Sequence, residues 1–265
     1  MLGARRWIDA EVAVDLDIDG VAAPDARRAV EATGIRADVF VQPAATRAKR
    51  LIIADMDSTM ITVECIDELA DYAGIKPQIA AVTEAAMRGE LDFAEALDAR
   101  VALLEGLPAA AIDQCHAERV RLMSGARTLV RTMHARGSHS VLVSGGFTAF
   151  ADRVGEAIGF AKVVANTLII AGDRLAGTVA KPIVDSDTKL RTLRAEAAAH
   201  GIPIAATLAV GDGANDIPMI EAAGLGVAYH AKPKTEAAAA AAVRYGDLTT
   251  LLYAQGIARA AWVES

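Results

Sequence analysis

The sequence predicts an α/β protein: a Rossmann-like, doubly wound parallel sheet with a helical cap inserted after the first core strand and a small βαβ-like unit at the N-terminus. From residue 51 onward, short apolar strands alternate with longer helical patterns. About 70 residues after Asp55 contain no convincing strand, and residues 11–19 alternate apolar and polar side chains. In such a fold, ligands bind beyond the carboxyl ends of the parallel strands.

The N-terminal unit is predicted to span residues 1–45 as a truncated, regulatory-type βαβ unit. The stretch EVAVDLDID predicts a strand with one wet face, Pro24 opens a helical pattern that ends near Gly34, and ADVFVQ predicts a second strand. About 45 residues are too few to bury a core alone, so we expect this unit to pack on the core or on a second subunit. The basic residues of QPAATRAKR, which follow, are expected to form a solvated boundary.

The core is predicted to comprise residues 46–62 and 125–265, and the cap residues 63–124. In the core, LIIAD, SVLVSGG, TLAVGDG and GLGVAYH are typical of strands, GARTLVRTMHARG and DTKLRTLRAEAAAHG of helices, and NTLIIAGDRLAGTV of a β-hairpin. The alanine run at 237–242 predicts a helix. Four helical patterns make up the cap: ECIDELADYAG, PQIAAVTEAAMRG, DFAEALDARVALLEG and PAAAIDQCHAER.

Composition narrows the class of partner. The chain has 265 residues and a formal charge of −7, which argues against the broad basic surface that nucleic acid requires. No apolar run approaches the roughly 20 residues of a membrane span. Cys65 and Cys115 form no disulfide or metal-ligand pattern, which fits a reducing cytoplasm. We therefore expect a cytoplasmic protein with a small-molecule partner, without nucleic acid or membrane; the oligomeric state, a homodimer included, stays open.

Two carboxylates end the first core strand. Asp55 and Asp57, one residue apart, would face the same side of an extended chain. Two such charges repel each other unless a cation lies between them or one is protonated, and Mg²⁺ prefers oxygen ligands of this kind. The same residues would also suit an acidic turn in which Asp57 or Ser58 caps the next helix.

Further polar residues follow the other strands. Ser144 precedes two glycines, so a hydroxyl and exposed backbone N–H groups would form an anion cradle, although an ordinary strand-to-helix turn uses the same residues. The stretch GDGAND supplies a candidate metal ligand at Asp212. A phosphoryl group also needs positive charge besides the metal, for which Lys189 and Lys181 are both candidates.

The order of these motifs is more specific than any one of them. DMDSTMITVECIDELA, VSGGFTAFADR and GDGANDIPMIEAAGLGVAYHAKPK together resemble the haloacid dehalogenase (HAD-like) superfamily of phosphohydrolases, and most closely its phosphoserine phosphatases. The resemblance runs from about Lys49 to about Gly256. It implies Mg²⁺-dependent hydrolysis of O-phospho-L-serine through an aspartyl-phosphate, the last step of serine biosynthesis.

The resemblance also implies a role for each motif residue. Asp55 would be the nucleophile, Asp57 the acid and base, and Mg²⁺ would be held by the Asp55 carboxylate, the Asp57 backbone carbonyl and Asp212. Lys189, which matches the family better than Lys181, would bind the phosphoryl oxygens. The further polar residues implied in the site are Ser144 and Gly145 as phosphoryl ligands, Asn215 as a substrate ligand, and Asp216 as the support of Lys189.

Phosphoserine carries a carboxylate and an ammonium, so its pocket needs one cation and one anion. Phe93 and Arg100 lie two helical turns apart on an apolar stripe, where an arginine either extends to solvent or holds a buried anion. The resemblance implies that Arg100 binds the substrate carboxylate and Glu64 its ammonium. It also implies that Met87 and Phe93 close over the substrate.

Three other functions stay open. A receiver-type signalling module also gathers carboxylates, a hydroxyl and a lysine at strand ends, but it needs neither a second aspartate at this spacing nor a 70-residue insertion. A phosphotransferase that passes phosphate from phosphoserine to homoserine would share the enzyme motifs. A non-catalytic amino-acid sensor would have no need of Asp57.

Overall fold

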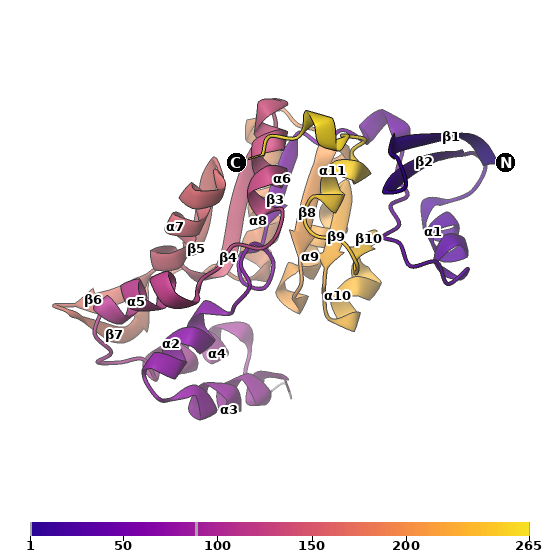
Figure 1. The fold of residues 1–265 in the computed structure, drawn as a ribbon. Coiled ribbons are helices and arrows are strands. Elements are labelled where there is room, and N and C mark those ends of the chain that lie inside the picture. Colours follow the sequence, from indigo (N-terminus) through magenta and orange to yellow (C-terminus); the bar gives the residue numbers. More distant parts are fainter. Residues whose placement is uncertain (1, 88–89, 265) are drawn as a thin grey trace.

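The computed structural model describes residues 2–87 and 90–264, and a six-stranded parallel sheet lies at its centre (Figure 1). The strand order is β10-β9-β8-β3-β4-β5. The predicted doubly wound sheet is therefore confirmed. The strands of this sheet are β3 (Leu51–Ala54), β4 (His139–Phe147), β5 (Lys162–Asn166), β8 (Thr207–Gly211), β9 (Leu225–Tyr229) and β10 (Ala241–Val243).

Helices cover both faces of the sheet, which explains why its central strands are almost wholly apolar. In β3, Ile52 points into one core and Ile53 into the other. Helices on the first face are α6 (Ala126–Ala135), α7 (Thr148–Ile158) and α11 (Thr250–Ala254); those on the second are α8 (Ser186–Ala199) and α9 (Ile217–Ala222). Both faces of the sheet are buried, so its carboxyl edge is the part left open for a site.

The chain leaves β3 directly into a group of helices beyond the carboxyl edge of the sheet (Figure 1). They are α2 (Cys65–Tyr72), α3 (Lys76–Met87), α4 (Phe93–Ala102) and α5 (Ala110–Arg119), so the four predicted cap helices are confirmed. The predicted hairpin is also present, as β6 (Leu168–Ala171) and β7 (Arg174–Val179). Its Leu175 carbonyl accepts from the Gly106 N–H at 2.9 Å, which ties the hairpin to the cap.

The N-terminal unit differs from the predicted βαβ order. β1 (Leu2–Asp9) and β2 (Ala13–Ile18) form an antiparallel hairpin, and α1 (Ala23–Glu31) follows it. The stretch ADVFVQ is wrong as a strand, because residues 37–42 have no sheet partner. The Asp38 carboxylate instead accepts backbone N–H groups of Arg244 and Gly246 at 2.7 and 2.9 Å, so a side chain joins this segment to the core.

The basic segment before β3 is wrong as a solvated boundary. Arg47 binds both carboxylate oxygens of Asp15 at 2.5 and 2.6 Å. Lys49 is buried, and its ammonium donates to the carbonyls of Thr46 and Ala205. These residues therefore attach the N-terminal hairpin and the first core strand to the rest of the fold.

Only the first two residues of the alanine run at 237–242 are helical, so the predicted helix over the whole run is wrong. Helix α10 (Pro233–Ala238) ends inside it, and Ala241 and Ala242 belong to β10, which pairs with β9 at the edge of the sheet. All three residues of β10 are buried. Tertiary pairing thus overrides the helix propensity of alanine here. Among the described residues, no helix is both long and apolar enough to cross a membrane.

Candidate active site

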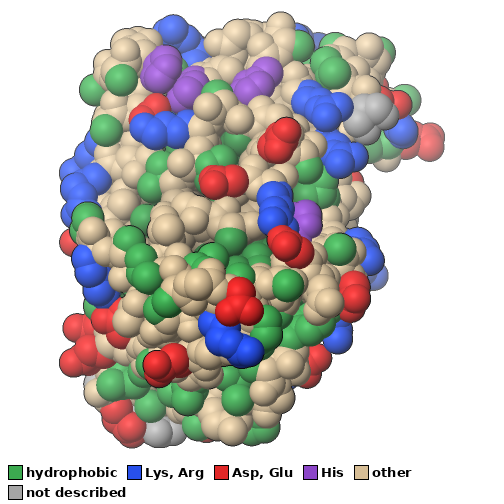
Figure 2. Space-filling view, turned by 90° about the vertical axis from the view of Figure 1, so that its left-hand side faces the viewer, with side chains coloured by type: hydrophobic (Ala, Val, Ile, Leu, Met, Phe, Trp, Pro, Cys, Tyr) green, Lys and Arg blue, Asp and Glu red, His purple; other side chains and the backbone are tan. Residues whose placement is uncertain are grey.

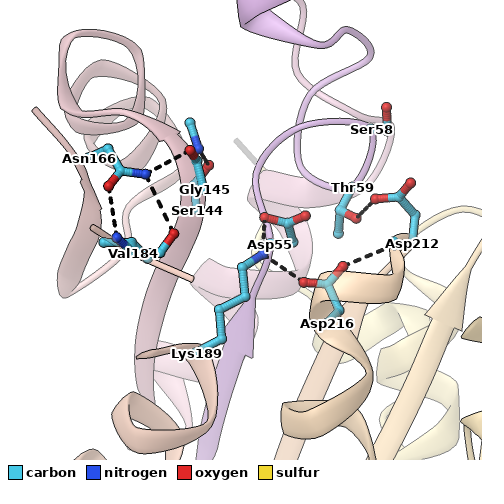
Figure 3. A network of polar contacts seen from close by, with 12 residues as sticks. Asp55, Ser58, Thr59, Ser144, Gly145, Asn166, Val184, Lys189, Asp212 and Asp216 are labelled. Carbon is cyan, nitrogen blue, oxygen red and sulfur yellow. Dashed lines mark hydrogen bonds and ion pairs between the residues drawn. The ribbon is translucent and has the colours of Figure 1, made fainter. Parts of the chain in front are cut away.

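Polar side chains from three neighbouring strands and one helix meet at the carboxyl edge of the sheet (Figure 3). Asp55 follows β3, Ser144 lies near the end of β4, and Asp212 follows β8. The Asp55 N–H donates to the Val210 carbonyl at 3.0 Å, so the sheet ladder fixes the backbone of Asp55. Lys189 reaches the same space from the first turns of α8. The predicted residues of four motifs are therefore brought together.

A buried lysine lies at the centre of this group. The Lys189 ammonium donates to Asp55 Oδ1 at 2.7 Å and to Asp216 Oδ1 at 2.6 Å. Lys189 and Asp216 are both fully buried, and Asp55 is 6% exposed. The alternative candidate, Lys181, pairs instead with Asp98 of α4 near the surface. The structure thus distinguishes the two lysines that the residue pattern alone left open.

The group carries more negative than positive charge. Burial, and then the charge of Asp216, raises the pKa of Asp55 well above its ordinary value. The same two causes, followed by the charge of Glu64, raise the pKa of Asp212 to about 6. Burial lowers the pKa of Lys189, but Asp216 and Asp55 more than offset this and raise it overall. Three carboxylates therefore lie close together beside one ammonium, which bonds two of them, and a further cation would stabilise their ionised forms.

The carboxylates of Asp55, Asp212 and Asp216 each offer an oxygen within 4.8 Å of the others. Asp216 already uses both of its oxygens, one for Lys189 and one for the Gly213 N–H at 3.0 Å. Asp55 and Asp212 each keep one oxygen without such a bond, since Asp212 accepts only from Thr59, at 3.3 Å. An all-oxygen set of this kind fits a hard divalent cation.

Asp57 lies on the loop between β3 and the cap. Its Oδ1 accepts the Cys65 N–H at 3.2 Å. Burial, and then the negative charge of Glu64, raises the pKa of Asp57 to about 7. A Cβ atom added to Gly146 would lie 2.8 Å from Asp57 Oδ2, so this carboxylate lies directly against the glycine turn of β4. Asp57 is therefore able to exchange a proton near neutral pH at that turn.

The glycine turn itself is closely packed. The Ser144 hydroxyl accepts the Gly146 N–H at 2.9 Å, and Ser144 is buried. A Cβ atom on Gly145 would lie 3.2 Å from the ring of Phe93, a residue of cap helix α4. Phe93, the first residue of helix α4, thus packs on the turn that the sequence predicted as an anion cradle.

One polar residue of this site was not among the predicted ones. Asn166 ends β5, is buried, and donates to the Gly145 carbonyl at 2.8 Å (Figure 3). Its Oδ1 accepts the Val184 N–H at 2.7 Å. It therefore joins the glycine turn to the loop that leads to Lys189. The sequence signal for it was slight: an asparagine after the apolar run KVVA, in a strand that was itself not predicted.

The remaining predicted site residues with described side chains lie outside the hydrogen-bond network around Lys189. The exposed Glu64 accepts the Ser58 hydroxyl at 2.6 Å. Arg100 is partly buried, and burial holds its pKa below its ordinary value, although the charges of Asp67 and Glu64 act to raise it. Within the described part of the chain, the half-buried Asn215 has no hydrogen bond to Lys189, Asp55 or Asp216. Met87 ends α3, and its side chain lies outside the described part of the structure.

A doubly wound α/β core, with carboxylates and a buried lysine at its strand ends and a helical cap beyond them, defines a capped phosphoryl-transfer type of site. The chain belongs to the haloacid dehalogenase-like hydrolase family, whose model matches residues 52–221. This membership leaves the receiver-type module and the non-catalytic sensor without support. It also confirms the superfamily that the motifs indicated.

Proteins similar to this chain include phosphoserine phosphatases. The chain is 48% identical to one from Streptomyces coelicolor over 93% of this chain and 61% of that protein. It is 45% identical to one from Polaromonas sp. over 77% of this chain and 88% of that protein. A solved phosphoserine phosphatase, an analogue of the phospho-aspartyl intermediate, matches 77% of this chain and 98% of its own with 36% identity and a TM-score of 0.72.

The match to the longer relatives is partial. The chain spans between 52% and 66% of the length of the first four curated relatives. The matched family model runs from residue 52 in β3 to residue 221 in α9, and so includes the cap and the site residues named above.

Proposed function

We propose that this chain is a Mg²⁺-dependent phosphoserine phosphatase that hydrolyses O-phospho-L-serine to serine and phosphate, the last step of serine biosynthesis. The observation that carries the proposal is the buried Lys189, bonded to Asp55 and Asp216 at a strand edge that also holds Asp57. The relatives of similar sequence, which are named phosphoserine phosphatases, support the substrate.

The metal would be held by the free oxygens of Asp55 and Asp212, with the Asp57 backbone carbonyl as a third ligand. Both carboxylates have raised pKa values in the metal-free protein, which fits a site that lacks one positive charge. When bound, Mg²⁺ supplies charge neutralisation for the phosphoryl oxygens and for the two carboxylates. Asp216 would act through Lys189, since both of its oxygens are already bonded.

In the first displacement, Asp55 attacks phosphorus with the carboxylate oxygen that would not hold the metal, as Lys189 turns from that oxygen to the phosphoryl group. The bond from phosphorus to the serine oxygen breaks as Asp57 donates its proton to that oxygen, and serine leaves. The pKa of about 7 for Asp57 suits this step, because a large fraction of the group is protonated near neutral pH. The product on the protein is an aspartyl-phosphate at Asp55.

In the second displacement, water attacks the same phosphorus. Asp57, now ionised, takes a proton from the water, and the bond from phosphorus to the Asp55 oxygen breaks. Phosphate is released and Asp57 carries a proton again, so the cycle closes without a further reactant. One residue thus acts as acid and then as base, as the two half-reactions require.

The phosphoryl oxygens would be bound by Lys189, by the Ser144 hydroxyl and by the backbone N–H of Gly145. Asn215 would complete the polar surround. These donors are held before substrate arrives: Ser144 by its bond with Gly146, and the turn by Asn166. Preorganised donors of this kind stabilise the charge that develops in the transition state.

Recognition of the amino acid would come from the cap. Arg100 would bind the substrate carboxylate with two parallel hydrogen bonds, and Glu64 would bind the ammonium. Their charges already interact across the space between α2 and α4 in the substrate-free protein. Phe93, which packs on Gly145, and Met87 would close over the substrate from the same side.

We propose the same domain boundaries that the sequence predicts. Residues 1–45 would form the N-terminal unit, residues 46–62 and 125–265 the core, and residues 63–124 the cap. Both cysteines, Cys65 and Cys115, are free and buried, which supports a cytoplasmic location. The proposed partner is a small molecule, the substrate phosphoserine. The oligomeric state, a homodimer included, stays open.

The test of the activity is phosphate release from phosphoserine, phosphothreonine, phosphohomoserine and sugar phosphates, with Mg²⁺ and with a chelator. We expect phosphoserine to give the highest kcat/KM, and chelation or Asp55→Asn to abolish turnover. Asp98→Asn is the matched control, because it neutralises a carboxylate of the cap whose partner is the exposed Lys181. A stable phosphoprotein without turnover, or full activity of Asp55→Asn, would contradict the mechanism.

The test of the cap residues is separate. Arg100→Lys and Glu64→Gln are expected to raise KM for phosphoserine at least about tenfold, the loss of one charge-assisted hydrogen bond of about 1.5–3 kcal/mol. On a phosphate ester without carboxylate and ammonium, KM should change little in both variants; Glu64→Gln should also shift the pH dependence on that ester, because the charge of Glu64 raises the pKa of Asp57. Equal loss on both kinds of ester would refute the assignment, and faster transfer to added homoserine than to water would identify a phosphotransferase instead.

A further inference from the structure

Three ligand-type side chains meet at the edge of the sheet opposite the catalytic carboxylates. His139 opens β4, Glu196 lies in the last turn of α8, and His200 directly follows that helix. One ligand atom of each residue lies within 4.8 Å of the other two. Figure 2 shows several histidine side chains near the top of the face that is turned to the viewer, with basic and acidic groups below them.

This group is well separated from the catalytic site, although the same two elements carry both. Ser144 lies five positions after His139 in β4, about 16 Å at the rise of a strand. Glu196 lies seven positions after Lys189 in α8, about 10 Å at the rise of a helix. A ligand here would therefore not contact the catalytic carboxylates.

The side chains are already arranged around one oxygen. His139 Nε2 lies 3.0 Å from Glu196 Oε2, and His200 Nδ1 lies 3.9 Å from the same atom. The two imidazole rings stack with centroids 3.9 Å apart and planes 23° from parallel. Glu196 and His200 are four residues apart, so they lie on the same side at the end of α8.

The remaining polar contacts decide what could bind. Lys162 donates to Glu196 Oε1 at 2.6 Å, and His200 Nδ1 lies 3.0 Å from the Glu196 backbone carbonyl. Burial raises the pKa of Glu196, but hydrogen bonds from Lys162 and His139 outweigh it and hold that pKa below its ordinary value. The carboxylate is therefore ionised at neutral pH. The Lys162 side chain is 47% exposed and is free to turn to solvent.

We propose that His139, Glu196 and His200 form a second metal site, which takes a divalent transition metal of the zinc type. Two imidazole nitrogens and one carboxylate oxygen are the donors that Zn²⁺, Co²⁺ and Ni²⁺ prefer, whereas Mg²⁺ prefers oxygen. The metal would replace the contact of His139 with Glu196 and that of His200 with its backbone carbonyl. His200 is exposed and gives the ion a path from solvent.

A metal bound at this site would connect the end of α8 to the start of β4. Because α8 carries Lys189 and β4 carries Ser144, the bound metal would hold the two elements whose opposite ends line the catalytic site. We expect it to raise the thermal stability of the chain. The catalytic chemistry itself does not use it.

The experiment is a calorimetric titration of the full, chelator-treated chain with Zn²⁺ in excess Mg²⁺, and a parallel titration with Co²⁺ read from its visible absorption. We expect one Zn²⁺ per chain, with affinity at least about tenfold weaker in His200→Asn and in Glu196→Gln. His230→Asn is the matched control, since it removes another exposed histidine, whose ring bonds the Gly246 carbonyl and lies edge-on to Tyr229. Asp212→Asn is the control for the catalytic carboxylates, and both controls should bind as the parent does.

Absence of Zn²⁺ binding at millimolar concentration would overturn the proposal. So would binding that is lost in Asp212→Asn but kept in His200→Asn, because the ion would then occupy the catalytic carboxylates. Equal weakening in His230→Asn would mark the binding as unspecific and would also overturn it. His200 is exposed, so its substitution leaves the fold intact, which a circular dichroism spectrum will check.

Discussion

Asp212→Asn should make the metal-free protein more stable. Asp212 lies beside a buried group with more carboxylates than ammonium, and burial followed by the charge of Asp216 raises its pKa from 3.8 to about 6. That difference corresponds to about 3 kcal/mol of lost stability in the ionised protein. Because Asp212 is partly exposed, we expect about 1–2 kcal/mol after solvent screening. Asparagine keeps an oxygen that can accept the Thr59 hydroxyl.

The pH dependence follows from the raised pKa. At a pH below 3.8, Asp212 is protonated in both the folded and the unfolded chain and contributes no penalty. Between pH 3.8 and about 6 the unfolded chain ionises first, so the folded chain loses relative stability progressively, and the loss is complete above about pH 6. The variant has no such titration. Its advantage over the parent should therefore be near zero at about pH 4 and full at about pH 8.

The assay is urea unfolding at both pH values, first with chelator and then with excess Mg²⁺. In Mg²⁺ the parent should gain stability by binding the ion, while Asp212→Asn should gain little, so the difference shrinks or changes sign. Asp98→Asn is the control, since its exposed pair with Lys181 should give no pH-dependent gain. A variant less stable than the parent in chelator at about pH 8 would refute the electrostatic reasoning.

Two further substitutions test the packing around the site and the N-terminal unit. Asn166→Ala leaves the Gly145 carbonyl and the Val184 N–H buried without their partner, so we expect a loss of about 2–4 kcal/mol in urea unfolding and a raised KM. Arg47→Ala removes the two bonds to Asp15, so we expect faster proteolysis within residues 1–40 and an unchanged kcat.

Each of these substitutions has a close control. Thr167→Ala changes the exposed residue next to Asn166 and should cost less than about 0.5 kcal/mol. Arg6→Ala removes a more exposed partner of the same Asp15 and should leave proteolysis nearly unchanged. If Thr167→Ala lost as much stability as Asn166→Ala, or Arg6→Ala was cleaved as fast as Arg47→Ala, the buried contacts would not explain the effects.

The sequence predicts the core of the site well because three of its parts follow strands. Asp55, Ser144 and Asp212 each come at the carboxyl end of an apolar run, and parallel strands bring such ends to one edge of a sheet. A lysine on a helix has no comparable constraint. Lys189 is distinguished from Lys181 only by tertiary structure, which buries the first and leaves the second at the surface.

The missed features are those whose partners lie far away in sequence. Asn166 bonds backbone groups 21 and 18 residues away, so no local pattern marks it. Strand β1 contains charged residues rather than a clean alternation, and it is held by β2 in a hairpin exposed to solvent. Residues 241–243 have the composition of a helix and form a strand because β9 offers a free edge. In each case a distant partner decides the conformation.

The nucleophile and the acid-base group of the proposed mechanism are held in different ways. Asp55 extends a fully buried strand, and Lys189 holds it from a helix of the core. Asp57 lies on the loop into the cap, where the Cys65 N–H binds it and the charge of Glu64 raises its pKa. An ammonium bound at Glu64 would offset that charge and lower the pKa of Asp57. Recognition of the amino acid would thereby be coupled, through the cap, to the proton transfer that hydrolysis needs.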